Sequence, residues 1–350
     1  MTRIAVLGAG SWGTALAISL ARGGHAVTLW ARRPEAADEI RATRRSRYLP
    51  QGEVPASVAV TSDPEAAVEG ADVWLVAVPS QTVRGVVTPL AGSLGAETTV
   101  VSVAKGIETE TLLTTSAVLR DVLPAADPCR VGVLYGPSHA EEVAEHRPTS
   151  VVAAFPEAAV AARVQDLFMA PALRVYTNTD LVGVEVGGSV KNVMALAAGM
   201  SDGLGLGDNA KAALVTRGLA EITRLGLAMG AQAHTFAGLA GLGDLVVTCF
   251  SGHSRNRGFG ERVGRGETTE NALDASTMVV EGVRTTASVR ALARRHGVEM
   301  PITEAVHAIL FEGLAPAEAV SALMTRDPKL EGALGRDPAR EGPAFDGTEA

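Results

Sequence analysis

The sequence is poor in cysteine and has no excess of basic residues. Its two cysteines, Cys129 and Cys249, lie far apart, with no CxxC spacing and no histidine-rich partner. That pattern fits a reducing cytosol and gives no case for a structural zinc site, and no other metal constellation is visible. Acidic residues outnumber basic ones by 39 to 31, and the formal net charge is -8. A nucleic-acid partner is therefore not expected, because proteins that bind nucleic acids carry a basic face.

Long apolar segments are also scarce. Residues 4–21 are uncharged after a short Arg-bearing start and superficially resemble a signal peptide. Gly8, Gly10 and Gly13 would break the apolar helix that a signal peptide requires, and no other segment approaches a membrane span. The sequence thus predicts a cytoplasmic protein with no membrane span.

The chain does contain enough apolar material for two domains, with 350 residues and 47% hydrophobic content. Up to residue 179, short runs rich in Val, Ile and Leu alternate with helical patterns, which predicts a doubly wound, mostly parallel sheet covered on both faces. From 180 to 328 helical patterns dominate and predict an all-α domain. Residues 329–350 are rich in Gly, Pro and acidic residues, which predicts a disordered tail. The strands are expected at 3–7, 26–30, 73–78, 99–103 and 131–135, with further short elements at 149–155 and 173–177.

A glycine motif follows the first predicted strand. Gly8, Gly10 and Gly13 form a GxGxxG pattern directly after residues 3–7 and directly before a helix. The first glycine permits a tight turn, the second lets a pyrophosphate approach the backbone, and the third allows close packing of the helix. In this context the motif predicts a Rossmann-type domain that binds a dinucleotide. The alternative is a purely structural glycine-rich turn.

The second predicted strand ends without an acidic residue. Folds that select NAD usually place Asp or Glu there, but this chain has Arg32 and Arg33 after Trp30 and Ala31. Two guanidinium groups could pair with a 2'-phosphate or stack on adenine, so NADP should be accepted as well as NAD. The alternative is a solvated basic turn.

One lysine interrupts an otherwise apolar helical stretch. Between the end residues Asp180 and Asp202, Lys191 has Glu185 as its only ionisable companion. Burial would depress the pKa of Lys191, which suits a proton-transferring base. Asn192 beside it can supply a hydrogen bond without adding charge, which makes both residues candidates for contact with a substrate. The alternative is a lysine that reaches the surface next to a structural amide.

Further polar residues follow turns and strands in positions that suit a small phosphorylated ligand. Ser254 could cap a helix and leave free N–H groups beside Arg255 and Asn256, which is how a phosphate is held. A capped surface helix with incidental arginines is the alternative. Three more candidates lie at strand ends, where open α/β sheets bind ligands, or after a glycine-rich turn: Lys105, the Gly136–Pro137–Ser138 segment and Asp244. His139 and His253 could be catalytic imidazoles, but neither has a carboxylate at a suggestive spacing, and both are interpreted as polar loop residues.

Taken together, these motifs make the chain similar to a known family. The series GAGSWGTALA (8–17), VAKGIE (103–108), YGPSHAEEV (135–143), GGSVKNVMALAAGMSDGLGLGDNAKAALVTRGLAE (187–221), GLAGLGDLVVTC (238–249), SRNRGFG (254–260), VEG (280–282) and EMPITEAV (299–306) occurs in order. It resembles the bacterial NAD(P)-dependent glycerol-3-phosphate dehydrogenases over residues 3–325. The resemblance implies a Rossmann domain followed by a helical domain, with the site between them. It also implies reversible hydride transfer between sn-glycerol 3-phosphate and NAD or NADP, which supplies the backbone of phospholipids.

The resemblance assigns roles to individual residues. Lys191 matches the proton acceptor, while Lys105 would orient the substrate and Asp244 would fix the geometry of the lysines. Substrate positions are matched by Lys105, Gly136, Ser138, Asp244, Ser254, Arg255 and Asn256. Cofactor contacts are matched by Ser11, Trp12, Arg32, Arg33, Lys105, Ala140, Arg255, Val279 and Glu281, with Tyr48 as a further candidate.

Two other functions are compatible with parts of the pattern. A related hydroxyacid or ketopantoate-type reductase would need a carboxylate site, and the SRNR segment suits phosphate better. A non-catalytic dinucleotide-binding sensor would have no reason to keep Lys191 in an apolar helix together with Lys105 and Asp244. The apolar helical domain is compatible with a homodimer.

Overall fold

The N-terminal half folds around one sheet of eight strands. The structure, a computed structural model, describes residues 1–276 and 279–328. The strands are β1 Arg3–Leu7, β2 Ala26–Trp30, β3 Ala59–Thr61, β4 Val73–Val76, β5 Thr99–Ser102, β6 Val131–Tyr135, β7 Thr149–Ala154 and β8 Leu173–Asn178. Their order is β3-β2-β1-β4-β5-β6-β7-β8, and all neighbours are parallel except β6 and β7. The predicted mostly parallel sheet is confirmed.

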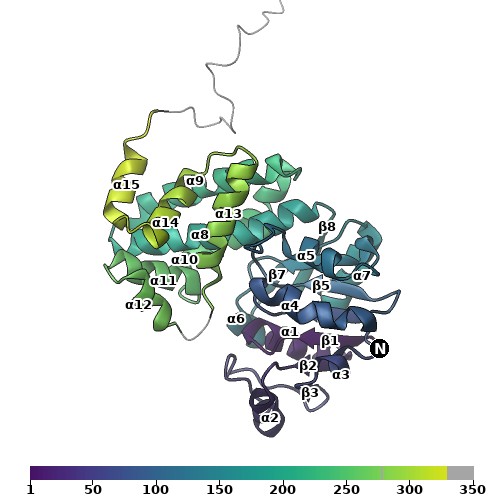
Figure 1. Ribbon diagram of the computed structural model, residues 1–350. Helices are drawn as coiled ribbons and strands as arrows, with labels where there is room; N and C mark the ends of the chain where they lie inside the picture. The colour runs from purple at the N-terminus through teal and green to yellow at the C-terminus, as the bar shows by residue number, and fades with distance from the viewer. Residues whose placement is uncertain (277–278, 329–350) are drawn as a thin grey trace, which may run out of the picture.

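Helices cover both faces of this sheet (Figure 1). They are α1 Ser11–Arg22, α2 Pro34–Thr43, α3 Pro64–Val68, α4 Val83–Val87, α5 Thr115–Val122, α6 Ala140–Ala144 and α7 Ala158–Phe168. Side chains of α1 and α7 pack in one apolar cluster, and those of α3, α4 and α5 pack in another. Because both faces are covered, β4, β5 and β6 are buried along their whole length, which accounts for their apolar sequences.

The strand boundaries differ from the prediction at several positions. The element predicted at 149–155 ends at Ala154, and the one predicted at 173–177 extends to Asn178. β3 was not predicted, because its three residues are too few to produce an alternating pattern. The strands predicted at 73–78 and 99–103 end earlier, at Val76 and Ser102. The residues after them belong to loops at the carboxyl edge of the sheet, and the loop after β5 carries Lys105.

The C-terminal half is helical, as predicted. Its helices are α8 Leu181–Gly203, α9 Gly207–Ala228, α10 Asp244–Phe250, α11 Arg255–Gly264, α12 Thr269–Asp274, α13 Glu281–Arg295, α14 Pro301–Phe311 and α15 Pro316–Met324. α8 runs through the middle of this lobe and contacts α9, α10, α11, α13 and α14 (Figure 1). The apolar composition of α8 therefore follows from contact with other helices on all sides.

Contrary to the prediction that no segment approaches a membrane span, α8 is long and apolar enough to cross a membrane by length and composition. In the structure, 89% of the most apolar 18-residue stretch of α8 is buried inside the protein. α8 thus has the burial of a core helix.

The sheet and the helical lobe are joined by a short connection. β8 ends at Asn178 and α8 begins at Leu181, where the Asp180 carboxylate caps the helix by accepting from Gly183 N at 2.9 Å. We propose that the chain divides into residues 1–179 and 180–328 at this connection. The predicted tail, residues 329–350, lies outside the described residues.

Candidate active site

The turn after β1 requires glycine at two positions. Gly8 has a φ of +127°, and a Cβ there would lie 2.6 Å from the carbonyl oxygen of Ala77. A Cβ at Gly13 would overlap the carbonyl oxygen of Gly8, so α1 packs directly against the turn. A Cβ at Gly10, in contrast, would meet no heavy atom within 4 Å. The turn leaves open space beside Gly10 and the start of α1, where a pyrophosphate binds in folds of this type.

The end of β2 brings Arg33 and Tyr48 together. The Arg33 guanidinium donates a hydrogen bond to Tyr48 Oη at 3.0 Å, and Arg32 is exposed beside it. The loop that carries Tyr48 is tied to the glycine turn by Ser46, whose hydroxyl donates to the carbonyl of Ala9 at 3.2 Å. Ser46 was not predicted, because its partner lies 37 residues away in the sequence.

Lys105, Lys191 and Asp244 meet where the two halves of the chain join. Lys191, in the middle of α8, donates from Nζ to Asp244 Oδ1. Lys105, after β5, donates from Nζ to Asp244 Oδ2 at 2.8 Å and to the Gly136 carbonyl at 2.9 Å. Asp244 is 0% exposed and Lys191 is 6% exposed. One buried carboxylate therefore holds two ammonium groups from different halves of the chain.

The surroundings of Lys191 bring its pKa close to neutral pH. Burial lowers the pKa of Lys191 from 10.5 to about 7, the negative charge of Asp244 acts to raise it, and the positive charge of Lys105 lowers it further. A buried amine in this range can both release and accept a proton under ordinary conditions.

Thr248 completes the surroundings of Lys191 and was not predicted. Lys191 Nζ donates to Thr248 Oγ1 at 2.7 Å, and the same hydroxyl donates to the Asp244 carbonyl at 2.6 Å. Thr248 lies one turn after Asp244 in α10. The four-residue spacing would have indicated it if residues 244–250 had been predicted as a helix.

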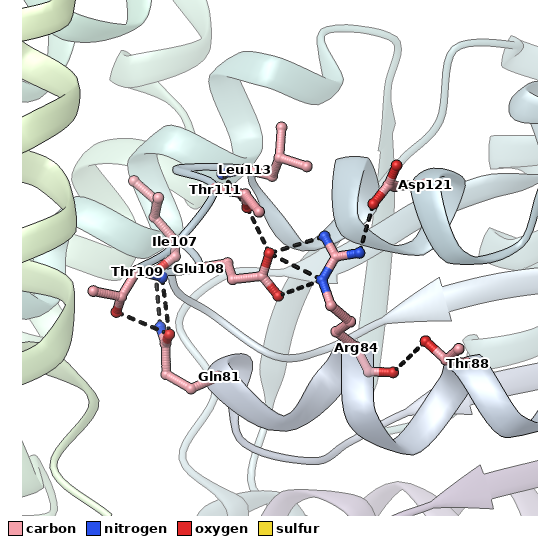
Figure 2. Close-up of polar contacts among 9 residues, drawn as sticks. All are labelled: Gln81, Arg84, Thr88, Ile107, Glu108, Thr109, Thr111, Leu113 and Asp121. Atoms are coloured by element: carbon pink, nitrogen blue, oxygen red, sulfur yellow. Dashed lines mark hydrogen bonds and ion pairs between the residues drawn. The ribbon is translucent and has the colours of Figure 1, made fainter.

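A polar network holds the loop between β5 and α5, next to Lys105 (Figure 2). Arg84 of α4 forms an ion pair with Glu108 at 2.9 Å, and the hydrogen bond from Arg84 lowers the pKa of that carboxyl group. Gln81 binds the backbone of the same loop, donating to the Ile107 carbonyl at 2.8 Å. Figure 2 also shows the contacts of Thr109, Thr111 and Asp121 in this network. These contacts thus fix the loop that carries Lys105 against α4 and α5.

α11 begins at the predicted phosphate-binding residues. Ser254 is its N-cap, since Ser254 Oγ accepts from the backbone N of Arg257 at 3.2 Å. Asn256 Nδ2 donates to Asn192 Oδ1 at 3.0 Å, and Asn256 Oδ1 accepts from Gly282 N at 3.0 Å. The structure therefore brings Asn192 and Asn256 together, one residue along α8 from Lys191.

The predicted cofactor contacts from the helical half are Arg255, the first residue of α11, Val279, and Glu281, the first residue of α13. Arg255 is exposed, and its Nη1 donates to the Val279 carbonyl at 3.1 Å. Glu281 crosses to the other half, accepting from Ser80 N at 3.1 Å and from Ser80 Oγ at 2.7 Å. Burial raises the pKa of Glu281. Ser80 was not predicted, because it precedes its partner by 201 residues.

The remaining predicted residues occupy the loop after β6 and the start of α1. The Ser138 hydroxyl donates to the Gly136 carbonyl at 2.9 Å, the same oxygen that accepts from Lys105. Ala140 is buried as the first residue of α6. Ser11 and Trp12 begin α1, and Trp12 packs against the apolar cluster beneath the sheet.

A cavity of about 1260 Å³ lies elsewhere, among α8, α9, α14 and α15. Its walls include Met200, Leu214 and Ile302, but not Lys105, Lys191 or Asp244. The candidate active site is therefore identified by the cluster of charged residues and not by this cavity.

A dinucleotide turn on a parallel sheet, joined to a helical domain with a buried lysine at the junction, defines the class of two-domain nicotinamide-dependent dehydrogenases. Family models match both halves: NAD-dependent glycerol-3-phosphate dehydrogenase N-terminus over residues 3–161, and the C-terminus of the same family over residues 180–321. The chain belongs to the NAD-dependent glycerol-3-phosphate dehydrogenase family.

Individual relatives agree with this assignment. Glycerol-3-phosphate dehydrogenase NAD(P)+ 2 of Salinibacter ruber is 61% identical over 331 residues, which cover 94% of this chain and 96% of that protein. The enzyme of Moorella thermoacetica is 54% identical over 324 residues, with 92% and 96% covered. The crystal structure of glycerol-3-phosphate dehydrogenase from Coxiella burnetii has a TM-score of 0.89 at 42% identity, and covers 93% of this chain and 99% of that one. The alternatives of a ketopantoate-type reductase and a non-catalytic sensor receive no support from these matches.

Proposed function

We propose that this protein reversibly reduces dihydroxyacetone phosphate to sn-glycerol 3-phosphate with NADH or NADPH, supplying glycerol 3-phosphate for phospholipid synthesis. The observation that carries the proposal is the buried cluster of Lys191, Lys105 and Asp244 at the junction of the two halves. The names of the relatives agree with the proposed reaction.

Lys191 acts as the general acid in reduction and as the general base in oxidation. When carbon 2 of dihydroxyacetone phosphate is reduced, the Lys191 ammonium donates a proton to the oxygen that forms there. In the reverse direction the neutral amine accepts that proton. A pKa of about 7 makes both protonation states accessible.

Lys105 and Asp244 hold this geometry. Asp244 receives hydrogen bonds from both lysines, so the carboxylate fixes the separation of the two ammonium groups. Lys105 directs its remaining donor capacity toward the substrate oxygen and polarises it, and its charge lowers the pKa of Lys191. Gly136, Ser138 and Asn192 line the same site as substrate contacts.

The phosphate group of the substrate binds at the start of α11. Ser254 caps α11 by accepting from Arg257 N, which leaves the backbone N–H groups of Arg255 and Asn256 for an anion, and the helix dipole favours negative charge there. Arg255 is exposed next to them and adds a guanidinium that can bind phosphate with two hydrogen bonds. Asn256 contributes from the next position.

The residues around the glycine turn fit a nicotinamide dinucleotide. Gly10 leaves space beside α1, and the first turn of α1 contains no acidic residue that would repel a pyrophosphate. Ser11, Trp12, Arg32, Arg33 and Tyr48 would hold the adenosine and pyrophosphate part, with Ala140, Val279 and Glu281 on the other side of the site. The bound cofactor supplies the hydride. The exposed Arg32 and Arg33 support use of NADP as well as NAD.

The deciding experiment follows the absorbance of the reduced cofactor during incubation of the purified protein with dihydroxyacetone phosphate. NADPH and NADH are compared in parallel, with unphosphorylated dihydroxyacetone as the control substrate. We expect oxidation that requires the phosphate group, and the ratio of the two rates reports the contribution of Arg32 and Arg33. If both cofactors bind and neither is consumed, the dinucleotide site stands and the proposed substrate is wrong.

We also propose that the protein is a cytoplasmic homodimer. Leu242, in the turn before α10, and Val246 and Phe250 of α10 are 39%, 40% and 49% exposed, which leaves large apolar side chains on the surface of this segment. Sedimentation of the purified chain would reveal a monomer if this proposal is wrong.

A further inference from the structure

His139 has a buried ring nitrogen without a partner. The residue lies between Ser138 and the first residue of α6, at the carboxyl edge of the sheet. Its Nε2 is shielded from solvent and has no hydrogen-bond partner among the described residues. Leaving a buried polar group unpaired is unfavourable, because the group has given up its hydrogen bonds to water. If the His139 ring turns so that Nε2 faces the site, a hydrogen bond to a bound group removes this cost.

His253 faces His139 from the other half of the chain. The two ring centroids are 5.6 Å apart, and the ring planes are inclined by 49°. His253 is exposed and immediately precedes Ser254, the N-cap of α11. The pair therefore spans the junction between the two groups of proposed substrate residues, Gly136 and Ser138 on one side and Ser254 to Asn256 on the other.

The charges around His139 favour its neutral form until an anion arrives. Burial lowers the pKa of His139, and the positive charge of Lys191 on α8 lowers it further. Glu141 and Glu142 of α6 act in the opposite direction, and His253 again lowers the pKa. A phosphate dianion placed beside the ring would favour the imidazolium.

We propose that His139 and His253 bind the phosphate group of the substrate from the two halves of the chain. This inference rests on the proposed function and adds two residues to its phosphate site. Hydrogen bonds from two ring nitrogens to one oxygen, each about 2.8 Å long, span a distance compatible with the ring separation. The contact satisfies His139 Nε2 and closes the site only around a phosphorylated substrate. It makes the pair a determinant of substrate specificity.

The proposal predicts a characteristic effect of pH on substrate binding. Binding of the dianion takes up a proton on the His139 imidazole, so the KM for dihydroxyacetone phosphate should rise as the pH increases from about 6.5 to 8.5. The phosphate group loses its own second proton near pH 6, so it remains largely a dianion over this range. If the histidines had only a structural role, substituting them would leave the pH dependence of KM the same as in the wild type.

The test uses His139→Gln, His139→Phe and His253→Asn in the full chain, with the exposed His234→Asn as the matched control. Removing a charge-assisted hydrogen bond should raise KM about 10- to 100-fold and change kcat far less. The amide of glutamine keeps an N–H donor, so His139→Gln should retain part of the affinity but lose the pH dependence, whereas His139→Phe should lose both. NADH affinity, measured for each variant, verifies that it is folded.

Two results would overturn the inference. The first is an unchanged KM, with an unchanged pH dependence, in the double variant of His139 and His253. The second is a fall in kcat with a solvent isotope effect at constant KM, which would mean that the pair transfers protons to Lys191. Titration of the imidazole NMR signals with inorganic phosphate separates this inference from the proposed function. A shift in His139 supports the anion site even if dihydroxyacetone phosphate is not reduced, and the absence of a shift contradicts it.

Discussion

The protonation state of Lys191 depends on the balance between burial, which disfavours its charge, and the Asp244 carboxylate, which stabilises it. If Lys191 is the general acid and base, Lys191→Ala should reduce kcat about 10²–10⁴-fold, the usual contribution of this kind of catalysis. Cofactor affinity should be unchanged, because Lys191 lies on α8, away from the glycine turn. Steady-state kinetics and NADH titration measure the two quantities. Near-native turnover would refute the assignment.

The same residue predicts opposite effects of pH in the two directions. Reduction requires the Lys191 ammonium, so its kcat/KM should fall as the pH rises through about 7, the pKa of Lys191. Oxidation requires the neutral amine, so its kcat/KM should fall as the pH decreases through the same value. Rate profiles in both directions test this prediction. Because the KM for a phosphorylated substrate is itself expected to rise with pH, kcat is compared separately, and kcat profiles that fall on the same side in both directions would point to another proton donor.

Arg255 should act on substrate binding and hardly on the chemical step. Arg255→Ala removes the exposed guanidinium at the start of α11, and loss of a charge-assisted bond is expected to raise the KM for dihydroxyacetone phosphate about 10- to 100-fold. Arg265→Ala is the matched control, since Arg265 lies at the other end of α11 and is 66% exposed. Equal KM values for the two variants would place the phosphate site elsewhere.

Residues with a local sequence pattern were predicted, whereas residues whose hydrogen-bond partners are distant in the sequence were missed. Lys191 stands out in an apolar helix, and Ser254 has the sequence environment of an N-cap. Glu185 was noticed as the only other ionisable group between Asp180 and Asp202, but its hydrogen-bond partners were not predicted. Its buried carboxylate accepts from the backbone N of Ser116 at 2.8 Å and from the Thr114 hydroxyl at 2.9 Å. No spacing rule connects residues about 70 positions apart.

At the scale of the elements, α8 and α11 cross with their backbones in close contact. A Cβ at Gly199 would overlap the Arg257 carbonyl, whereas a Cβ at Gly258 would meet no heavy atom within 4 Å. Gly199→Ala should therefore destabilise the protein by about 1–3 kcal/mol through overpacking. Gly258→Ala, in the helix facing it, should stabilise by about 0.5–1 kcal/mol because alanine favours the helix. Thermal unfolding of the two variants measures the difference. Equal melting temperatures would contradict the proposed close contact between the backbones of α8 and α11.

The elements that were predicted are those long enough to show a recognisable pattern of apolar residues. The 23 residues of α8 and the five of β1 are clear in the sequence. β3 and α10 were missed, because three and seven residues next to glycine-rich or irregular segments carry too little periodicity. The antiparallel pairing of β7 with β6 could not be predicted either, because strand direction depends on the path of the intervening chain.

At the scale of the whole molecule, buried carboxylates connect elements that are distant in the sequence. Glu221 of α9 lies at the start of α14, where it accepts from Ile302 N at 2.6 Å and from Thr303 N at 3.2 Å. Burial nevertheless outweighs these bonds and raises the pKa of Glu221 from 4.5 to about 7. The native protein therefore favours the protonated carboxyl group over a range in which the unfolded chain is ionised.

This raised pKa makes stability depend on pH in a defined direction. The contribution of Glu221 is fully present below pH 4.5 and is lost as the pH rises through about 7, a total of about 3 kcal/mol at roughly 1.4 kcal/mol per pKa unit. Glu221→Gln cannot ionise. Its melting temperature relative to the wild type should therefore increase by several degrees between about pH 5 and pH 8. The exposed Glu270→Gln serves as the control and should show no such trend. A constant difference between Glu221→Gln and the wild type across this range would mean that Glu221 is ionised throughout, stabilised by the N-terminus of α14.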